Sequence, residues 1–543
     1  MKVRIFVALG AALMTVSAQG QDIYKVESLS GEDLSGTARF VGMGGAMSSL
    51  GADISVMGTN PAGTGLFRRS DFSLSGSVGI QPNGEDFFDI GKSRSSFDQI
   101  GFVYAARLGE ENVKFVNFGF NYHKRRNVKN YIGVNNFSTG GLSQSMQLRN
   151  LSFVNNGWLD LNLPGEGDPS NPDLLLTSPL TVLAYDTYVL NDRFRDGEFV
   201  GYDPLQANSY SYRRVQWGGI QQYDFNLSMN WNEQIYAGFT FGVQNVDIRS
   251  FTYYGENAAV SPNNGYGYFL NNEEALTGAG FDLKFGVILR PIEESPFRIG
   301  LSVHTPMFYD LTQSSYAYME SYLPLYNDVG GMDPTTSAND TELSLDYKIR
   351  TPWKFNLSMA TTVGNFFALD AEYEYSNYGS SKISYPDYDD YWGSWSGSTK
   401  DDALNNEIKN YMNSVSTFRI GAEARIAQGT YARVGYNYVS SPFKKDAYLN
   451  LFTDSPSYQY NTNTDYVNLG SINRVTCGVG FRGKHFYGDI AYQYQMQKGD
   501  LYTFHTADDG LGDIPVVGNN NLLKAAQVDL NRHNLMLTLG YKF

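Results

Sequence analysis

The sequence is poor in the residues that carry most enzyme and metal chemistry. It has one cysteine, Cys477, and five histidines among 543 residues. A single cysteine cannot form a disulfide within the chain, and the scattered histidines show no pair at metal-ligand spacing. No serine nucleophile elbow of a hydrolase is present. We therefore expect no catalytic residues, no metal site, no cofactor and no enzyme activity.

Long apolar runs are also missing. The longest near the start, Ile5 to Val16, is about twelve residues, whereas a membrane-spanning helix needs roughly twenty. Basic residues Lys2 and Arg4 precede this run, and the small residues of Ala18-Gln19-Gly20 follow it. This order predicts a cleaved signal peptide over residues 1–20, and therefore an exported protein without a membrane helix.

Basic charge is scarce relative to acidic charge. The chain has 41 Lys and Arg against 56 Asp and Glu, a net charge of −15. An acidic chain is a poor binder of nucleic acids, so we expect no nucleic-acid partner. Aromatic residues, by contrast, are abundant at 15%, with 40 tyrosines. Such an excess is typical of the aromatic girdles of membrane β-barrels.

The clearest positive pattern is alternation with a period of two. In residues 222–232 the odd positions include Phe225 and Leu227, whereas the even positions include Asp224 and Asn226. Alternation of this kind predicts a β-strand with one apolar and one polar face, as expected where one face meets lipid and the other a lumen.

The pattern recurs about fourteen times. Short turns and long polar loops alternate between these segments, and the longest loop is 125–221. Segment 343–363 contains Pro352 but keeps its parity, so we count it as one bent strand. The predicted strands are 71–80, 97–107, 113–124, 222–232, 235–249, 279–290, 297–312, 343–363, 366–377, 416–427, 430–439, 472–482, 485–496 and 532–543.

The last predicted strand, 532–543, has Leu535, Leu537 and Leu539 on one side and reaches a terminal Phe543. It resembles the final strand of bacterial outer-membrane barrels. We therefore predict an all-β fold, a transmembrane antiparallel barrel of about 14 strands that occupies residues 71–543. Its tight turns would lie at the periplasmic end and its long loops outside the cell.

Residues 21–70 carry the most specific motif. Gly42-Met43-Gly44-Gly45-Ala46 follows an alanine-arginine pair, and Asn60-Pro61-Ala62-Gly63 comes shortly after. A phosphate-binding loop is disfavoured, because no Lys-Ser/Thr follows and no strand precedes. The glycines permit tight backbone packing, and Pro61 fixes its own φ. Gly42, Gly44, Gly45, Asn60, Pro61 and Ala62 are the motif residues we single out.

This motif resembles the N-terminal hatch of the FadL/TodX family of outer-membrane transporters for long-chain fatty acids and other hydrophobic compounds. The resemblance extends more weakly through the barrel strands. It implies that residues 21–70 plug the lumen, and that a ligand diffuses passively to a pocket above a movable hatch. It also implies lateral release through the third strand, 113–124, where Gly119 could permit a bend. A lumen-packing role for Gly119 is the other interpretation.

An apolar stretch lies within the longest loop. From Pro179, the residues Leu180, Leu183 and Tyr188 follow near-helical spacing. We predict that they form the patch through which a hydrophobic or amphipathic ligand enters. Packing of the loop onto the barrel rim is an equal alternative. For a ligand carboxylate the candidate partners are Arg125, Arg126, Arg419 and Arg425.

Function is therefore predicted as outer-membrane transport of hydrophobic small molecules, with long-chain fatty acids as the expected substrate. The expected surroundings are outer-membrane lipid and lipopolysaccharide, and the expected state is a monomer. Two alternatives stay open. A general porin would have an open charged lumen, and an adhesin or structural barrel would use its long tyrosine-rich loops to bind a partner.

Overall fold

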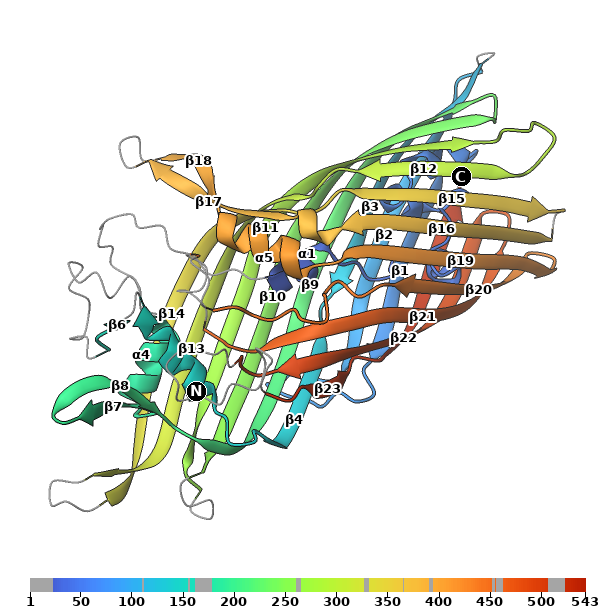
Figure 1. Cartoon of the computed structure of the whole chain (residues 1–543). Helices are drawn as coiled ribbons and strands as arrows, with labels where there is room; N and C mark the ends of the chain where they lie inside the picture. Colours follow the sequence, from blue (N-terminus) through green and yellow to red (C-terminus); the bar gives the residue numbers. More distant parts are fainter. Residues whose placement is uncertain are drawn as a thin grey trace.

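The protein is a closed ring of antiparallel strands (Figure 1). The computed structural model describes residues 23–109, 112–154, 157–161, 178–259, 265–326, 332–364, 366–389, 394–451, 455, 462–505 and 523–543. The predicted signal peptide, residues 1–20, lies outside the described residues.

Fourteen strand positions form the ring, which confirms the predicted barrel. The ring closes between its first and last strands, through pairs from Asp71↔Lys542 to Ile80↔His533. Two positions are each occupied by two strands in line. Around the ring the strands are β1 (Asp71–Ile80), β2 (Ser93–Arg107), β3 (Val113–Asn127), β9 (Ala207–Trp231), β10 (Ile235–Ala258), β11 (Gly267–Leu289), β12 (Arg298–His304) with β13 (Phe308–Tyr326), β14 (Met332–Arg350) with β15 (Lys354–Val363), β16 (Phe367–Asn377), β19 (Ser414–Ala427), β20 (Thr430–Val439), β21 (Tyr466–Arg482), β22 (Phe486–Tyr502) and β24 (Arg532–Lys542).

Four further strands extend the same sheet, and the other elements lie inside the ring or beyond its rim. The additional strands are β4 (Asn130–Ser138), β5 (Phe153–Val154), β6 (Gly157–Trp158), β7 (Leu190–Arg195), β8 (Glu198–Pro204), β17 (Lys382–Asp389), β18 (Ser394–Lys400) and β23 (Ala526–Asp529). The helices are α1 (Ile23–Ser30), α2 (Ala38–Gly42), α3 (Gln144–Leu151), α4 (Pro179–Asp186) and α5 (Asp402–Tyr411), with short 3₁₀ helices η1 (Ile54–Gly58), η2 (Pro61–Leu66) and η3 (Tyr378–Ser380).

Three expectations about the strands need correction. Segment 297–312 is not one strand, because β12 ends at His304 and β13 begins at Phe308. Segment 343–363 is not one strand either, because β14 ends at Arg350 and β15 begins at Lys354. Pro352 lies in the break and has no N–H to offer a strand ladder. The stretch 125–221, predicted as a loop, contains strands and helices, and β9 already begins at Ala207.

The two faces of the barrel are inverted relative to a soluble protein. Phe225 is 50% exposed, whereas its neighbour Asp224 is 0% exposed. The same holds around the ring, so an apolar belt faces outward and polar side chains fill the interior. A belt of this kind suits contact with lipid. Its members include Phe102, Phe118, Phe241, Phe285, Phe355, Phe418, Val475, Ile490 and Leu537.

Among the helices that the structure describes, none is both long and apolar enough to cross a membrane.

Three bodies of side chains fill the barrel from one end to the other. Nearest the tight turns, residues 34–66 pack inside the ring. Next, α1 and α5 share an apolar cluster with the inner wall. At the end that carries the long loops, α3, α4 and the β7–β8 hairpin form a second apolar cluster, which we call the outer cap (Figure 1). A candidate site must therefore lie between these bodies.

Candidate functional site

The glycine turn of the N-terminal segment touches strand backbone directly. α2 ends at Gly42, and Gly44 and Gly45 follow with φ of +66° and +82°. A Cβ added to Gly44 would lie 2.8 Å from the backbone N of Tyr436, and one added to Gly435 would lie 2.1 Å from the N of Gly44. Two glycines therefore face each other where the segment contacts β20.

The Asn60-Pro61-Ala62 motif begins η2 and presses on another part of the wall. The Asn60 side chain accepts a hydrogen bond from the N–H of Ala62 at 3.1 Å, and Pro61 occupies the first turn. All three residues are buried. A Cβ on Gly238 of β10 would lie 2.3 Å from the carbonyl carbon of Pro61. The motif residues thus lie together inside the barrel, and their role as a gate stays a prediction.

Carboxylates of β16 bind the backbone that follows the glycine turn. Glu372 accepts hydrogen bonds from the N–H groups of Met47 and Ser48 at 2.7 and 2.6 Å. Asp370 accepts two more from the next two residues, at 3.1 and 2.8 Å. These four bonds satisfy buried backbone N–H groups of the segment. They attach the segment to one side of the ring.

A buried ion-pair chain attaches the segment to a second side. The Arg39 guanidinium of α2 contacts Glu423 through two nitrogens, each at 3.0 Å. Glu423 also accepts from Arg433 at 2.6 Å, and Arg433 in turn contacts Asp489 at 2.6 Å. Arg433 and Asp489 have almost no exposed side-chain surface, so each charge depends on its partner.

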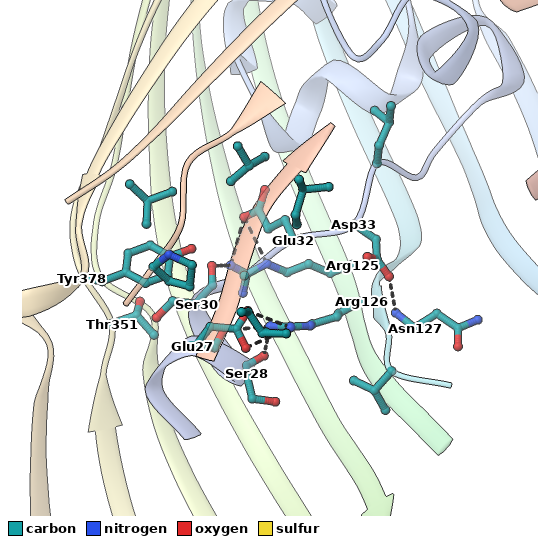
Figure 2. A pocket seen from close by; sticks show the side chains of 18 of the residues that line it. Glu27, Ser28, Ser30, Glu32, Asp33, Arg125, Arg126, Asn127, Thr351 and Tyr378 are labelled. Atoms are coloured by element: carbon teal, nitrogen blue, oxygen red, sulfur yellow. Dashed lines mark hydrogen bonds and ion pairs between the residues drawn. The ribbon is translucent and has the colours of Figure 1, made fainter. Parts of the chain in front are cut away.

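A cavity of about 270 Å³ lies above residues 34–66 and reaches α1. Figure 2 shows Arg125 and Arg126 extending from β3 toward the N-terminal segment, where they meet Glu32 and Glu27. The apolar cluster shared by α1 and α5 supplies another part of the wall, including Val128, Ile248, Leu276, Met307, Val415 and Phe443. The cavity is therefore lined by both apolar and charged side chains, and single strands such as β11 and β19 contribute both kinds.

The four arginines singled out in the sequence are poor candidates for binding an added carboxylate. Arg125 already contacts Glu32 at 2.9 Å, and Arg126 contacts Glu27 at 2.9 Å. Arg419 contacts Glu374 at 3.0 Å. Arg425 is exposed beside the tight turn that joins β19 to β20, away from the cavity.

Two other arginines of the cavity wall hold their charge with less compensation. Arg474 faces Gln495, and Gln495 faces Arg532, in the ladders of β21, β22 and β24. Arg474 approaches Asp33 only to 4.0 Å, and Arg532 makes no ion pair within 4 Å in the described ranges. The Nε of Arg532 is buried without a hydrogen-bond partner. The sequence alone does not reveal this pair, because its members are far apart in the chain and meet only through strand register.

The predicted capture residues lie in the outer cap. Leu180 and Leu183 are 1% and 2% exposed, on α4, within the apolar cluster of the cap. Tyr188 follows the helix with φ +59° and is 46% exposed. Burial raises the pKa of the nearby Tyr202 hydroxyl to about 12, so it stays protonated and donates to the Leu159 carbonyl at 2.7 Å. The part of Leu180, Leu183 and Tyr188 in ligand uptake stays a prediction.

Because Leu183 is a packing residue, Leu183→Asp should loosen the outer cap. A buried carboxylate without a partner and the loss of the leucine should together destabilise the cap by about 2–5 kcal/mol. Limited proteolysis of the folded barrel should then cut between residues 139 and 206 much faster. Tyr188→Asp is the matched control, since that side chain is already exposed, and equal cutting rates in the two variants would contradict the assignment.

Comparison with known proteins gives fold similarity alone. No protein-family model and no curated protein match the chain. Among solved structures it is similar to a FadL homologue of Pseudomonas aeruginosa, with 11% identity over 94% of this chain and 99% of the other, at a TM-score of 0.48. It is also similar to the Ralstonia pickettii toluene transporter TbuX (14%, 94% and 98%, TM-score 0.43) and the Pseudomonas putida toluene transporter TodX (10%, 97% and 100%, TM-score 0.42). These are the kinds of protein that the N-terminal motif resembles. The evidence for the barrel itself is the closed ring of strand pairings.

Proposed function

We propose that this protein is an outer-membrane diffusion channel for amphipathic small molecules that carry an acidic head group, such as long-chain fatty acids. The observation that supports this most is the mixed lining of the cavity above residues 34–66. Apolar side chains line it together with Arg474 and Arg532, which have little carboxylate compensation. An apolar chain with an anionic head matches both kinds of lining.

In the proposed route a ligand is captured at the outer cap and descends to the cavity. Its acyl part contacts the wall near Met307 and Phe443, and its carboxylate meets the two arginines. Residues 21–70 act as the hatch that forms the floor. Release occurs when the hatch shifts or, as the family resemblance implies, sideways near β3. No bond is made or broken, so transport follows the concentration gradient.

The test compares an acid with its own neutral ester. We expect protein purified in mild detergent to retain a long-chain fatty acid more tightly than its methyl ester in native mass spectrometry. The variant Arg474→Gln/Arg532→Gln should weaken acid binding by about tenfold or more, because charge-assisted hydrogen bonds are lost, and leave ester binding unchanged. Arg425→Gln is the control, since that arginine lies outside the cavity.

Either of two results would contradict the proposal. Equal retention of acid and ester in all variants would remove the role of the arginines. An empty barrel that conducts small ions freely in planar bilayers would instead favour a general porin.

A further inference from the structure

Two neighbouring positions of the barrel wall are interrupted at the same height. The β15–β16 ladder ends at Lys354↔Ser376. Farther from the tight turns, β14 takes over from β15, and β17 takes over from β16, with Arg350↔Lys382 as the first pair of the new ladder. β17 continues into β18, and the two form a hairpin that projects from the barrel (Figure 1). The wall therefore has a step between the two ladders.

A groove of about 400 Å³ lies on the outside of the wall at this step. Three aromatic side chains supply most of its lining, and all three are exposed. The lining residues are Trp353, Phe355, Tyr375, Asn377 and Ser380. Because the groove opens outward from the apolar belt, it suits an apolar chain that lies in the membrane.

The groove lies at the outer boundary of the membrane. β15 spans ten residues and ends at the tight turn to β16. A tilted strand of about nine to eleven residues crosses a bilayer. With the tight turns at the periplasmic end, as predicted from the sequence, Trp353 therefore lies where the hydrocarbon ends. Phe308 stacks on Phe281 at 5.5 Å beside the same step, and aromatic residues gather at this boundary.

Two basic side chains lie next to the groove, on the side away from the hydrocarbon. Arg350 and Lys382 face each other across the β14–β17 ladder. The adjacent pair, Ile349 and Ile383, is buried in the apolar cluster shared by α1 and α5. Since successive side chains of a strand point to opposite faces, Arg350 and Lys382 point outward.

These two charges have no acidic partner. The residue that faces Arg350 on its other side, in β13, is Phe308, so none of the three residues in this row is acidic. Within the described ranges, neither basic side chain forms an ion pair or a hydrogen bond with the protein. Their charge is therefore available to a group outside the protein.

A second basic row follows, one step farther from the membrane on the same face. Lys348 pairs in register with Ser384, and Ser384 pairs with Lys400 of β18. Asp310 faces Lys348 across the β13–β14 ladder and offsets part of its charge. The positive charge of the outer face is therefore strongest directly beside the groove.

An apolar groove bordered by two basic rows matches a lipid with a negatively charged head group. Arginine and lysine bind phosphate through charge-assisted hydrogen bonds. Two rows fit a head group that carries more than one phosphate. A fatty acid has a single charge and would leave the second row without a partner.

We propose that this outer face binds a bisphosphorylated glycolipid of the outer leaflet, the lipid A part of lipopolysaccharide. Its acyl chains lie in the aromatic groove, and its phosphates contact Arg350 and Lys382 first and the second row after them. The site faces the membrane and not the lumen, so the inference does not depend on the proposed transport function.

The test compares lipid A with the same lipid after removal of its phosphates, by native mass spectrometry of delipidated protein in mild detergent. We expect the protein to bind lipid A about tenfold or more tightly than the dephosphorylated lipid. Arg350→Gln/Lys382→Gln should abolish this preference, because charge-assisted hydrogen bonds to phosphate are lost. Trp353→Ala removes part of the groove and should weaken the binding of both lipids.

Arg213→Gln/Arg249→Gln is the matched control. It removes the same number of positive charges from the outer face of β9 and β10, where Arg249 already contacts Asp247 at 3.0 Å. The preference for lipid A should therefore remain in this variant. Heat-modified gel migration confirms that each variant has a folded barrel.

Two results would overturn the proposal. Equal binding of lipid A and the dephosphorylated lipid by the unaltered protein would show that the basic rows bind no phosphate. An equal loss of preference in the control would show that net charge alone is responsible. Retention of a fatty acid in the lumen should be the same in all of these variants, so failure of the outer site is distinguishable from failure of the transport function.

Discussion

Gly44→Ala should raise the ion conductance of the barrel. The added Cβ would lie 2.8 and 3.0 Å from backbone atoms of Tyr436, which belongs to a ring strand and cannot move aside. Overpacking of this size costs about 1–3 kcal/mol, so the undocked fraction of the N-terminal segment should rise about 5- to 150-fold. Conductance in planar bilayers should rise accordingly, while the thermal stability of the barrel stays unchanged.

Gly140→Ala separates the contact from backbone strain. Gly140 has φ +68°, nearly the value of Gly44, but nothing lies within 4 Å of an added Cβ. Both variants therefore carry the same penalty for a left-handed alanine, and only one carries the collision. Equal conductance in the two would mean that the contact with β20 does not hold the segment in place.

Glu423→Ala should have the second large effect, on the same segment from another side. Glu423 is the carboxylate that Arg39 and Arg433 share, and Arg433 keeps Asp489 as a second partner whereas Arg39 does not. Removing one partner from a buried ion pair costs about 3–5 kcal/mol, because the largely buried Arg39 guanidinium would lose its ion pair. Hydrogen exchange of the amides in residues 37–53 should therefore quicken by about a hundredfold or more.

The exposed pair between Arg68 and Glu233 provides the control. Their side chains are 60% and 36% exposed, so Glu233→Ala should change exchange little. If both glutamate variants exchange at the wild-type rate, the segment is held by packing alone. If exchange quickens throughout the ring strands, the network supports the barrel rather than the segment.

The membrane-embedded half of the barrel could be predicted from sequence, but the outer half only in part. Alternation identified all fourteen positions of the ring, because lipid contact demands apolar residues at every second position. In the part of the barrel outside the lipid, apolar residues are no longer required at every second position. Residues 207–221 of β9 therefore carry Tyr210, Tyr212 and Gln216 without a one-sided apolar pattern, and they read as loop.

The site was harder to predict, for a different reason. The sequence showed that Asp370 and Glu372 share the polar face of one strand, but their partners are backbone N–H groups more than 300 residues away. Likewise, Arg474 and Arg532 come together in the cavity wall only through the register of β21, β22 and β24. Pairing of this kind depends on three-dimensional position, and residue type alone does not reveal it.

The attachment of residues 34–66 to the inner wall also constrains how the protein assembles. Carboxylates such as Glu372 and Asp370, side by side on β16, would be left inside a ring that had closed empty, without the amides that they bind in the finished molecule. The ring is sealed by the ladder between β1 and β24, which joins its two ends. Sealing is therefore expected to be a late step in biogenesis, in which the unfinished sheet wraps around a segment already in place.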